Sequence, residues 1–226
     1  MTYELVVDDR PADLLVPELV SLAHEAIAAR GRFSLALPGG SVATTCFPRF
    51  AEAPIDWSRV HFFWGDERAV APTDESSNYG LAERLWLERI AKIGPTIHRM
   101  EAERADLDEA CERYERALRR NGPLDLALLG MGPDGHVCSL FPGHALLDER
   151  TRLVAAITDS PKPPPKRLTL TLPALHASRN VFVVATGEAK ADAVRRVRAG
   201  EPLPALRALS GPHRGRLMVD RAALGE

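Results

Sequence analysis

Short runs of consecutive apolar residues alternate along this chain with segments in which apolar residues recur every three or four positions. Consecutive apolar positions are typical of parallel strands covered on both faces, whereas the longer spacing is typical of an amphipathic helix. Strands are predicted at residues 3–7, 33–37, 60–64, 124–129, 168–171, 181–185 and 217–219. The alternation predicts βαβ units and therefore an α/β fold built on an open, mostly parallel, Rossmann-like sheet with helices on both faces.

The helical spacing is found in four segments. The first has an apolar face from Leu15 to Ala26 and is expected to end at Gly31, because glycine suits the left-handed conformation of a helix C-cap. The others cover residues 79–90, 107–120 and 189–197. The proline-rich residues 161–165 predict a rigid extended loop, which we favour over a domain linker because the next strand follows at once.

Composition predicts one domain over residues 1–226, with 45% hydrophobic and 27% charged residues. The net charge of −2 gives no general attraction to nucleic acid or an anionic membrane, although residues 160–226 carry 12 basic and 5 acidic side chains. Three scattered cysteines favour a reducing cytosol. Four acids among the first 13 residues argue against a signal peptide, and no apolar stretch approaches the ~20 residues that span a bilayer. We therefore expect a cytoplasmic protein.

The most informative segment follows the apolar run at 124–129. There the chain reads Gly130-Met131-Gly132-Pro133-Asp134-Gly135-His136, a glycine-rich turn that presents a carboxylate and an imidazole. Glycines in such a turn allow the backbone to approach a ligand closely, and histidine exchanges a proton readily near neutral pH. Residues 137–141 are apolar again and predict a short helix.

Unusual residues follow three other predicted strands as well. Pro38-Gly39-Gly40-Ser41 comes after residues 33–37, Gly65-Asp66-Glu67-Arg68 after 60–64, and Thr186-Gly187-Glu188-Ala189-Lys190 after 181–185. In an open parallel sheet, ligands bind in the crevice beyond the carboxyl ends of the strands. We therefore expect these four segments to converge on one site.

Each motif also has a simpler interpretation. Gly39, Gly40 and Ser41 suit an anion-binding turn at a helix N-terminus, but they equally suit a tight turn capped by Ser41. They match neither a P-loop nor a dinucleotide-binding fingerprint, so a nucleotide is not expected. The charges of Asp66 and Arg68 also fit a solvated ion pair, and isolated cations such as Arg167 and Lys190 are usually surface charges.

The sequence favours neither a thiol nucleophile nor a metal centre. Cys138 lies two residues from His136, but side chains with this spacing diverge on a helix, so a packing role is favoured for the thiol. The remaining histidines form no cluster with metal-ligand spacing, and no metal site is expected. The tryptophans are expected to be packing residues.

Taken together, the motifs resemble the 6-phosphogluconolactonases of the glucosamine-6-phosphate isomerase/6-phosphogluconolactonase superfamily. The resemblance spans roughly residues 3–221 and depends on motifs that occur in the same order: Gly39-Gly40-Ser41, Asp66-Glu67-Arg68 with Ser77-Asn78-Tyr79-Gly80, residues 130–136 with Ser139-Leu140-Phe141-Pro142-Gly143, and Arg167-Leu168-Thr169-Leu170-Thr171. Two segments depart from it: Val42-Ala43-Thr44-Thr45, where the family often has Thr-Pro, and Val137-Cys138, where Thr-Ala is common. Neither departure removes a group that the chemistry requires.

The resemblance implies a NagB- and CoA-transferase-like sheet and hydrolysis of 6-phospho-D-glucono-1,5-lactone to 6-phosphogluconate, the second step of the oxidative pentose phosphate pathway. His136 is then the expected general base, oriented by Asp134. Substrate binding is expected from Gly39, Gly40, Ser41, Asp66, Arg68, Arg167 and Lys190, with the last two and Ser41 at positions that hold the 6-phosphate in the superfamily. No metal or organic cofactor is expected. The expected partner is this small phosphorylated lactone, with no nucleic acid or membrane partner, and the expected assembly is a monomer or weak homodimer.

Two alternatives stay open. The first is a sugar-phosphate isomerase–deaminase of the same superfamily, which places a glutamate soon after the histidine; residues 137–147 contain no acid, which favours the lactonase. The second is a non-catalytic sugar-phosphate-binding module of a regulator. That class carries a DNA-binding helical domain, for which there is no room before residue 33, and has no need of His136.

Overall fold

A parallel sheet runs through the centre of the computed structural model, which describes residues 3–226. Its strands are β1 (Glu4–Val7), β2 (Phe33–Leu37), β3 (Val60–Trp64), β5 (Thr96–Ile97), β6 (Leu126–Gly130), β9 (Asn180–Ala185) and β10 (Arg214–Val219). They lie in the order β1-β10-β9-β6-β2-β3-β5, and every neighbouring pair is parallel. The predicted parallel α/β architecture is therefore confirmed. β2 and β6 meet at only two register positions, Leu35 with Leu126 and Ala36 with Ala127.

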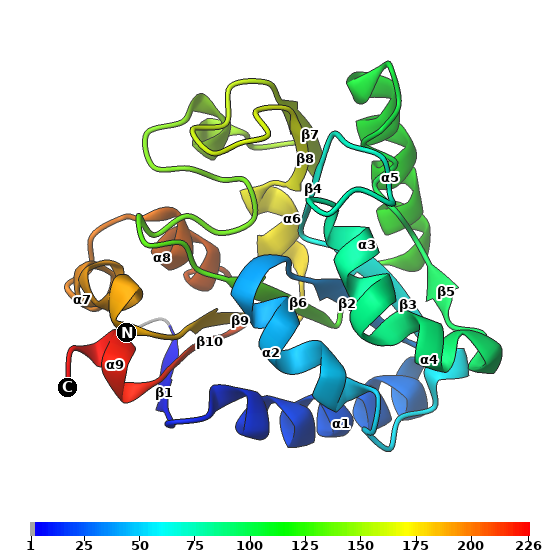
Figure 1. The fold of residues 1–226 in the computed structure, drawn as a ribbon, viewed down its shortest axis with the longest axis horizontal. Coiled ribbons are helices and arrows are strands. Elements are labelled where there is room, and N and C mark those ends of the chain that lie inside the picture. Colours follow the sequence, from blue (N-terminus) through cyan, green and yellow to red (C-terminus); the bar gives the residue numbers. More distant parts are fainter. Residues whose placement is uncertain (1–2) are drawn as a thin grey trace.

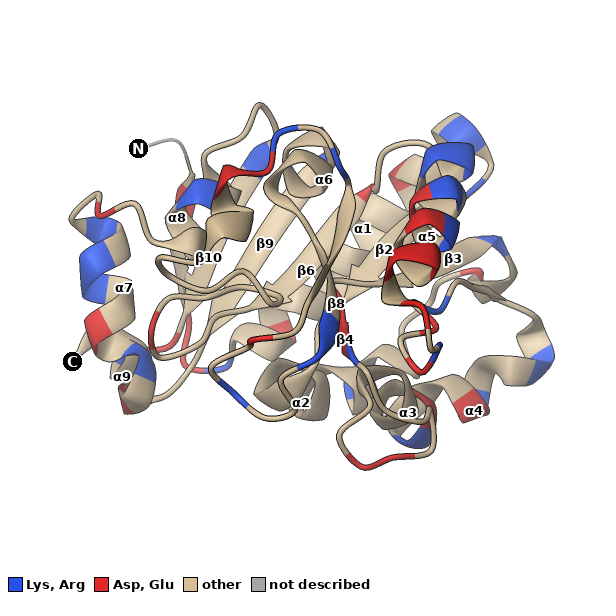
Figure 2. Cartoon of the chain, turned by 90° about the horizontal axis from the view of Figure 1, so that it is seen from above, with Lys and Arg blue, Asp and Glu red and all other residues tan. Residues whose placement is uncertain are grey.

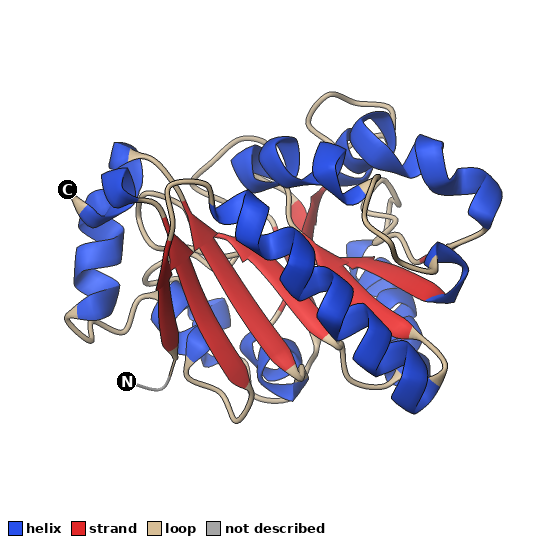
Figure 3. Ribbon diagram, turned by 90° about the horizontal axis from the view of Figure 1, so that it is seen from below, coloured by secondary structure: helices blue, strands red, loops and turns tan. Residues whose placement is uncertain are grey.

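Helices cover both faces of this sheet (Figure 3). They are α1 (Pro11–Arg30), α2 (Gly40–Phe50), α3 (Asn78–Ala82), α4 (Glu88–Ile90), α5 (Leu107–Asn121), α6 (Leu172–Ala177), α7 (Ala191–Arg198), α8 (Pro204–Leu209) and α9 (Arg221–Leu224). The helix α1 ends as predicted at Gly31, which has a left-handed φ of 73°. The predicted helix at 79–90 is α3 and α4 joined by a wider π-helical turn, Glu83–Leu87.

Successive residues of the central strands point into two separate cores. In β6, Leu126 and Leu128 pack in the core beneath α1 and α2, whereas Ala127 and Leu129 pack in the core on the opposite face. β9 divides in the same way, with Phe182 in the first core and Val183 in the second. Because side chains alternate between the faces of a strand, an unbroken apolar run is needed to fill both cores.

A second, antiparallel sheet is the main departure from the predicted fold. It has the order β4-β8-β7, formed by β4 (Asp66–Arg68), β8 (Arg167–Leu170) and β7 (Val154–Ile157). Figure 1 shows it beside α5, away from the strands of the large sheet. The strand predicted at 168–171 thus exists, but it lies in this antiparallel sheet and does not belong to the parallel one. All four residues of β8 are buried, so its apolar run resembles that of a central parallel strand.

Gly65 joins the two sheets. Its N–H donates to Leu37 O at the end of β2, and its carbonyl oxygen accepts from Leu170 N in β8. An added Cβ at Gly65 would lie 2.9 Å from Cys138 Sγ, which is closer than real Cβ atoms approach. The residues after β3 therefore turn directly from the large sheet into β4.

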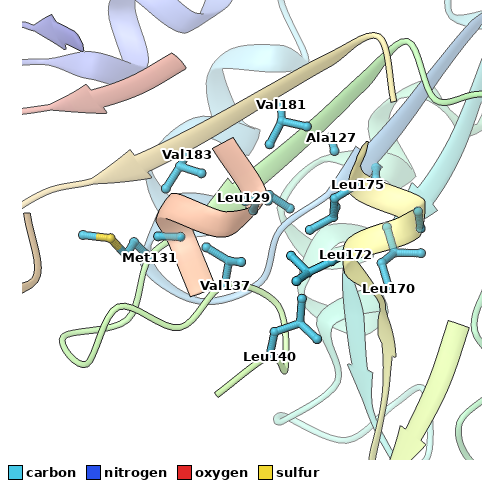
Figure 4. Close-up of a cluster of buried hydrophobic side chains, with 14 of the residues drawn as sticks. Ala127, Leu129, Met131, Val137, Leu140, Leu170, Leu172, Leu175, Val181 and Val183 are labelled. Carbon is cyan, nitrogen blue, oxygen red and sulfur yellow. The ribbon is translucent and has the colours of Figure 1, made fainter. Parts of the chain in front are cut away.

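The prediction of a short helix at residues 137–141 is wrong. Val137 instead forms antiparallel bridges with Met131 and Leu140, and Cys138 has a φ of 51°, which a right-handed helix does not allow. Val137 and Leu140 point into the apolar core beside Leu129 and Val183 (Figure 4). This buried turn fixes the end of the loop that carries His136.

Charged side chains are concentrated away from the strands of the large sheet. Figure 2 shows red and blue bands along α5 and blue over much of α7. None of the helices described in residues 3–226 is both long and apolar enough to cross a membrane.

Candidate active site

A cavity of ≈ 270 Å³ lies beyond the carboxyl ends of β2, β3 and β6, where parallel α/β sheets bind ligands. Segments from all four predicted strand ends contribute to its wall, so their convergence is confirmed. The lining residues are Pro38, Gly39, Gly40, Ser41, Val42, Gly65, Asp66, Arg68, Leu129, Gly130, Met131, Gly132, Pro133, His136, Cys138, Lys162, Pro163, Arg167 and Lys190. Of the predicted site residues, only Asp134 does not line the cavity, and its carboxylate contacts Nδ1 of His136.

His136 and Asp134 form the closest polar pair of the site. His136 Nδ1 lies 2.5 Å from Asp134 Oδ1, a contact that requires a proton between the two atoms. Burial lowers the pKa of His136, and the charge of Lys162 lowers it further against the opposing effect of Asp134. The imidazole is thus favoured in its neutral form with the proton on Nδ1. Its Nε2 then carries a free lone pair, as a general base requires.

Packing fixes the plane of the imidazole. The Phe141 ring lies against it with the centroids 4.8 Å apart, and Gly132 also lies close to it. A Cβ at Gly132 would come within 2.0 Å of the His136 ring atoms Cε1 and Nδ1, so the ring needs a glycine there. The glycine-rich turn therefore serves to seat the histidine as well as to bend the chain.

The Gly39-Gly40-Ser41 turn opens directly into α2. Gly39 is the N-cap residue, Gly40 has a φ of 64°, and no side chain caps the helix. The alternative of a turn capped by Ser41 therefore does not hold. The first residues of α2 line the cavity and no side chain caps their N–H groups, which is the arrangement that anions favour at helix N-termini.

A buried amide holds this turn in place. A Cβ at Gly39 would lie 2.0 Å from Asn78 Oδ1, so only glycine fits against Asn78. The Asn78 side chain donates from Nδ2 to the backbone oxygen of Asp66 at 2.8 Å and to its carboxylate at 3.1 Å. Asn78 therefore packs against the glycine turn and bonds to the first residue of β4.

Asp66, Glu67 and Arg68 have different surroundings. The buried Asp66 carboxylate accepts a 2.7 Å hydrogen bond from Ser139 Oγ, and this bond joins β4 to the His136 loop. The Glu67 carboxylate instead accepts from the backbone of Asn78 and Tyr79 at the start of α3. Arg68 lines the cavity and donates from Nη1 to the Ser76 carbonyl oxygen at 2.6 Å. The cluster is therefore not a simple solvated ion pair.

Arg167 lies at the cavity wall, but its guanidinium binds mainly to the neighbouring loop. It donates to the backbone oxygens of Lys162, Pro163 and Pro164 at 2.9–3.1 Å and lies 3.8 Å from the Asp66 carboxylate. The residue is only 3% exposed. Arg167 thus fixes the proline-rich loop predicted at 161–165, in addition to facing the cavity.

Two lysines supply the more accessible positive charge. Lys190 lies at the end of the short turn before α7, and its pKa is lowered by burial and then by the charge of Lys162. Lys162 Nζ lies 3.3 Å from His136 Nδ1 and 3.7 Å from Asp134 Oδ1. Sequence reasoning missed Lys162, because the stretch Pro161 to Pro165 indicated only a rigid loop.

Cys138 also lines the cavity, which its predicted packing role did not anticipate. Burial and the charge of Asp66 raise the pKa of its thiol well above the ordinary value, so the nucleophilic thiolate is suppressed. Within residues 3–226, no cluster of three or more His, Cys, Asp or Glu side chains is arranged to hold a metal ion. The ionisable side chains in the cavity wall include the imidazole of His136, the carboxylate of Asp66 and the cations of Arg68, Lys162, Arg167 and Lys190.

Comparison with known proteins gives consistent matches. The family model described as "Glucosamine-6-phosphate isomerases/6-phosphogluconolactonase" matches residues 8–219. The chain is 43% identical over 211 residues to a human 6-phosphogluconolactonase, covering 86% of this chain and 81% of the relative. It is 41% identical over 200 residues to 6-phosphogluconolactonase of Mycobacterium bovis, covering 81% of each. The crystal structure of 6-phosphogluconolactonase from Thermotoga maritima superposes with a TM-score of 0.86 at 30% identity, covering 96% of this chain and all of that one.

Proposed function

The chain belongs to the glucosamine-6-phosphate isomerase/6-phosphogluconolactonase family, and on this basis we propose that it hydrolyses 6-phospho-D-glucono-1,5-lactone to 6-phosphogluconate with His136 as the general base. The activity follows from relatives that are more than 40% identical to it over at least 200 aligned residues. The assignment of His136 depends on one observation: an imidazole bonded through Nδ1 to Asp134 lies in the cavity wall, where burial lowers its pKa.

His136 acts twice in this reaction. Its Nε2 removes a proton from a water molecule as the water oxygen bonds to the lactone carbonyl carbon. The carbonyl electrons move onto its oxygen, and when they return, the bond to the ring oxygen breaks. The imidazolium then gives its proton to that departing oxygen, which leaves the free acid and restores the neutral histidine. Asp134 holds the ring through Nδ1 and stabilises the transient cation.

The negative charges of the reaction have matching partners on the cavity wall. The N–H groups at Gly39 and Gly40, or the guanidinium of Arg68, stabilise the oxyanion. Lys190 and the start of α2 at Ser41 bind the 6-phosphate. Arg167 contributes positive charge from the same wall and keeps the loop at 161–165 in place.

The residues that follow His136 favour a lactonase over an isomerase–deaminase. That segment contains no acid from Val137 to Leu147, and the residue it places against the imidazole is Phe141. Amino-sugar ring opening is expected to use a carboxylate from this segment. The regulatory alternative is also disfavoured, because a binding module needs no activated histidine.

The surroundings of the protein are inferred along with its activity. We expect a cytoplasmic location, in keeping with three cysteines that are all unpaired in the structure. The binding partner is the phosphorylated sugar lactone, and assembly as a monomer or weak homodimer stays a prediction.

The test is acid release from freshly generated 6-phosphogluconolactone, measured above its spontaneous hydrolysis and in the presence of a chelator. We expect His136→Asn to remain folded and to lower turnover 10²- to 10⁴-fold, about 3–5 kcal/mol in the barrier. A folded His136→Asn variant with the parent turnover would refute the assignment. Ammonia release from glucosamine-6-phosphate without lactone hydrolysis would show a deaminase, and sugar-phosphate binding without either activity would show a regulatory module.

A further inference from the structure

Lys162 is the one charged side chain of the cavity wall that touches the His136–Asp134 pair without belonging to its loop. Its Nζ lies 3.3 Å from His136 Nδ1 and 3.7 Å from Asp134 Oδ1, and its side chain is 38% exposed. It lines the cavity together with His136. Nothing in the chemistry of lactone hydrolysis derived above uses this ammonium group.

The position of Lys162 is fixed by its backbone. Its carbonyl oxygen accepts hydrogen bonds from Arg167 Nη2 at 2.9 Å and from Ser160 Oγ at 2.9 Å, and its N–H donates to Ser160 Oγ. Arg167 is buried and reaches across to Ser139 in the His136 loop. The backbone that carries Lys162 is therefore held by hydrogen bonds within the loop, within reach of the Asp134–His136 pair.

The geometry also determines what the ammonium does there. The 2.5 Å contact of His136 Nδ1 with Asp134 needs the Nδ1 proton, so Nδ1 offers Lys162 no lone pair. The 3.3 Å contact is consequently electrostatic: the ammonium attracts the Asp134 carboxylate and repels a positive charge on the imidazole. Two carboxylates also face His136, Asp134 on its own loop and Asp66 on β4, and both stabilise the imidazolium. Lys190, at the start of α7, adds a second positive charge near Lys162.

We propose that Lys162 is a positioning residue of the lactonase site, which acts through the Asp134–His136 pair to keep the imidazole neutral and to return its proton to the leaving oxygen. The proposal rests on the proposed function, because it assigns a role within the same reaction. Its consequence is a base that stays active at lower pH. A cation beside His136 destabilises the imidazolium, which moves the acid limb of the activity profile down and makes the imidazolium a stronger acid in the second step.

The test compares Lys162→Gln and Lys162→Met, which remove the charge, with Lys162→Arg, which keeps it. Lys166→Gln is the matched control, because Lys166 lies in the same loop, is exposed and does not line the cavity. The first readout is the pKa of His136 in the ligand-free protein, followed by the NMR shift of its Cε1 proton and assigned with His136→Asn. We expect both neutral variants to raise this pKa by about 0.5–1 unit, less than for a buried pair because the ammonium is partly solvated. Lys162→Arg and the control are expected to leave it close to the parent value.

The second readout is the pH dependence of kcat/KM for 6-phosphogluconolactone, whose acid limb reports the free enzyme. We expect the limb to move to higher pH by the same amount, so that at a pH below the limb the neutral variants lose about 3- to 10-fold more activity than on the plateau. An equal loss at every pH with an unchanged His136 pKa would overturn the proposal and assign Lys162 to substrate charge alone. A shifted His136 pKa in a protein without lactonase activity would instead refute the proposed function and leave the electrostatic role standing.

Discussion

Ser139→Ala tests whether the second sheet holds the catalytic loop. Ser139 is fully buried, and its Oγ donates a 2.7 Å hydrogen bond to the Asp66 carboxylate on β4. Its backbone N–H donates to Thr169 Oγ1 on β8 at 3.1 Å. The substitution removes this bond and the weaker 3.4 Å bond that Oγ accepts from Arg167 Nη1, and it keeps the backbone bond, so it tests the side-chain links between the two parts of the site.

The expected cost follows from the burial of the acceptor. Asp66 is 7% exposed, and without Ser139 its carboxylate keeps the 3.1 Å bond from Asn78 and the more distant Arg167. A hydrogen bond to a charged group contributes about 1.5–3 kcal/mol, so the free energy of unfolding should fall by that amount. For a chain of this size, each kcal/mol lowers Tm by roughly 2–4 °C, so the total shift is about 3–12 °C.

The assay is urea denaturation of Ser139→Ala at neutral pH, with Ser21→Ala as the control, since Ser21 is exposed on α1 and its Oγ donates to Glu25 in the same helix. We expect a lower midpoint at an unchanged m value for Ser139→Ala and a change below about 0.5 kcal/mol for the control. A double-mutant cycle with Asp66→Asn should show that the two losses are not additive. Additive losses, or a cost below about 0.5 kcal/mol for Ser139→Ala, would show that the link is not energetically important.

Lys190→Ala should lower kcat/KM on the phosphorylated lactone about 10- to 150-fold and change it little on unphosphorylated gluconolactone, because a bond to a charged group contributes about 1.5–3 kcal/mol; equal losses on both substrates would place the phosphate elsewhere. Cys138→Ser should keep most of the activity, since its thiol pKa is raised by burial and Asp66, and an acyl-enzyme at Cys138 found by mass spectrometry would contradict this. The stacked His61 and His98 should make the fold sensitive to acid, because burial lowers the pKa of both in the folded state from about 6.5. The stability that these two histidines contribute is complete above the unfolded pKa, and it is lost as the pH falls through their lower pKa values in the folded state. The urea midpoint of the parent should therefore decrease from pH 7 to pH 5, and His98→Gln should make this decrease smaller. A decrease as large as that of the parent would refute the reasoning.

The parallel sheet and most of the site were predictable because they depend on local sequence. A strand buried on both faces needs an unbroken apolar run, and a turn that seats an imidazole needs glycines, so β6 and the Asp134–His136 pair were both recognisable. The placement of β8 was not, because an antiparallel strand that is buried along its whole length carries the same apolar pattern as a parallel one.

Side-chain direction in irregular segments was beyond what sequence patterns indicate. The residues after His136 are apolar enough for a helix, but the left-handed backbone at Cys138 forms a turn that tertiary bonds to Ser139 hold in place. Lys162 lies in the proline-rich stretch and Lys166 follows it directly, and only the fold brings the first of them to His136, in a contact between residues 26 positions apart. The missing information was long-range in both cases.

The narrow pairing of β2 with β6 has a consequence for how the chain acquires its activity. The two paired positions join residues 35–36 to residues 126–127, so about 90 residues of chain separate the partners. During synthesis at 5–20 residues per second, β2 waits roughly 5–20 s with one edge unpaired, and an unpaired strand edge can associate with other chains. The glycine turn that starts α2 is thus synthesised early, and the site is complete only when His136, Lys162, Arg167 and finally Lys190 have followed. Substitutions that delay the docking of β6 should therefore reduce the yield of folded protein more than the turnover of each molecule that folds.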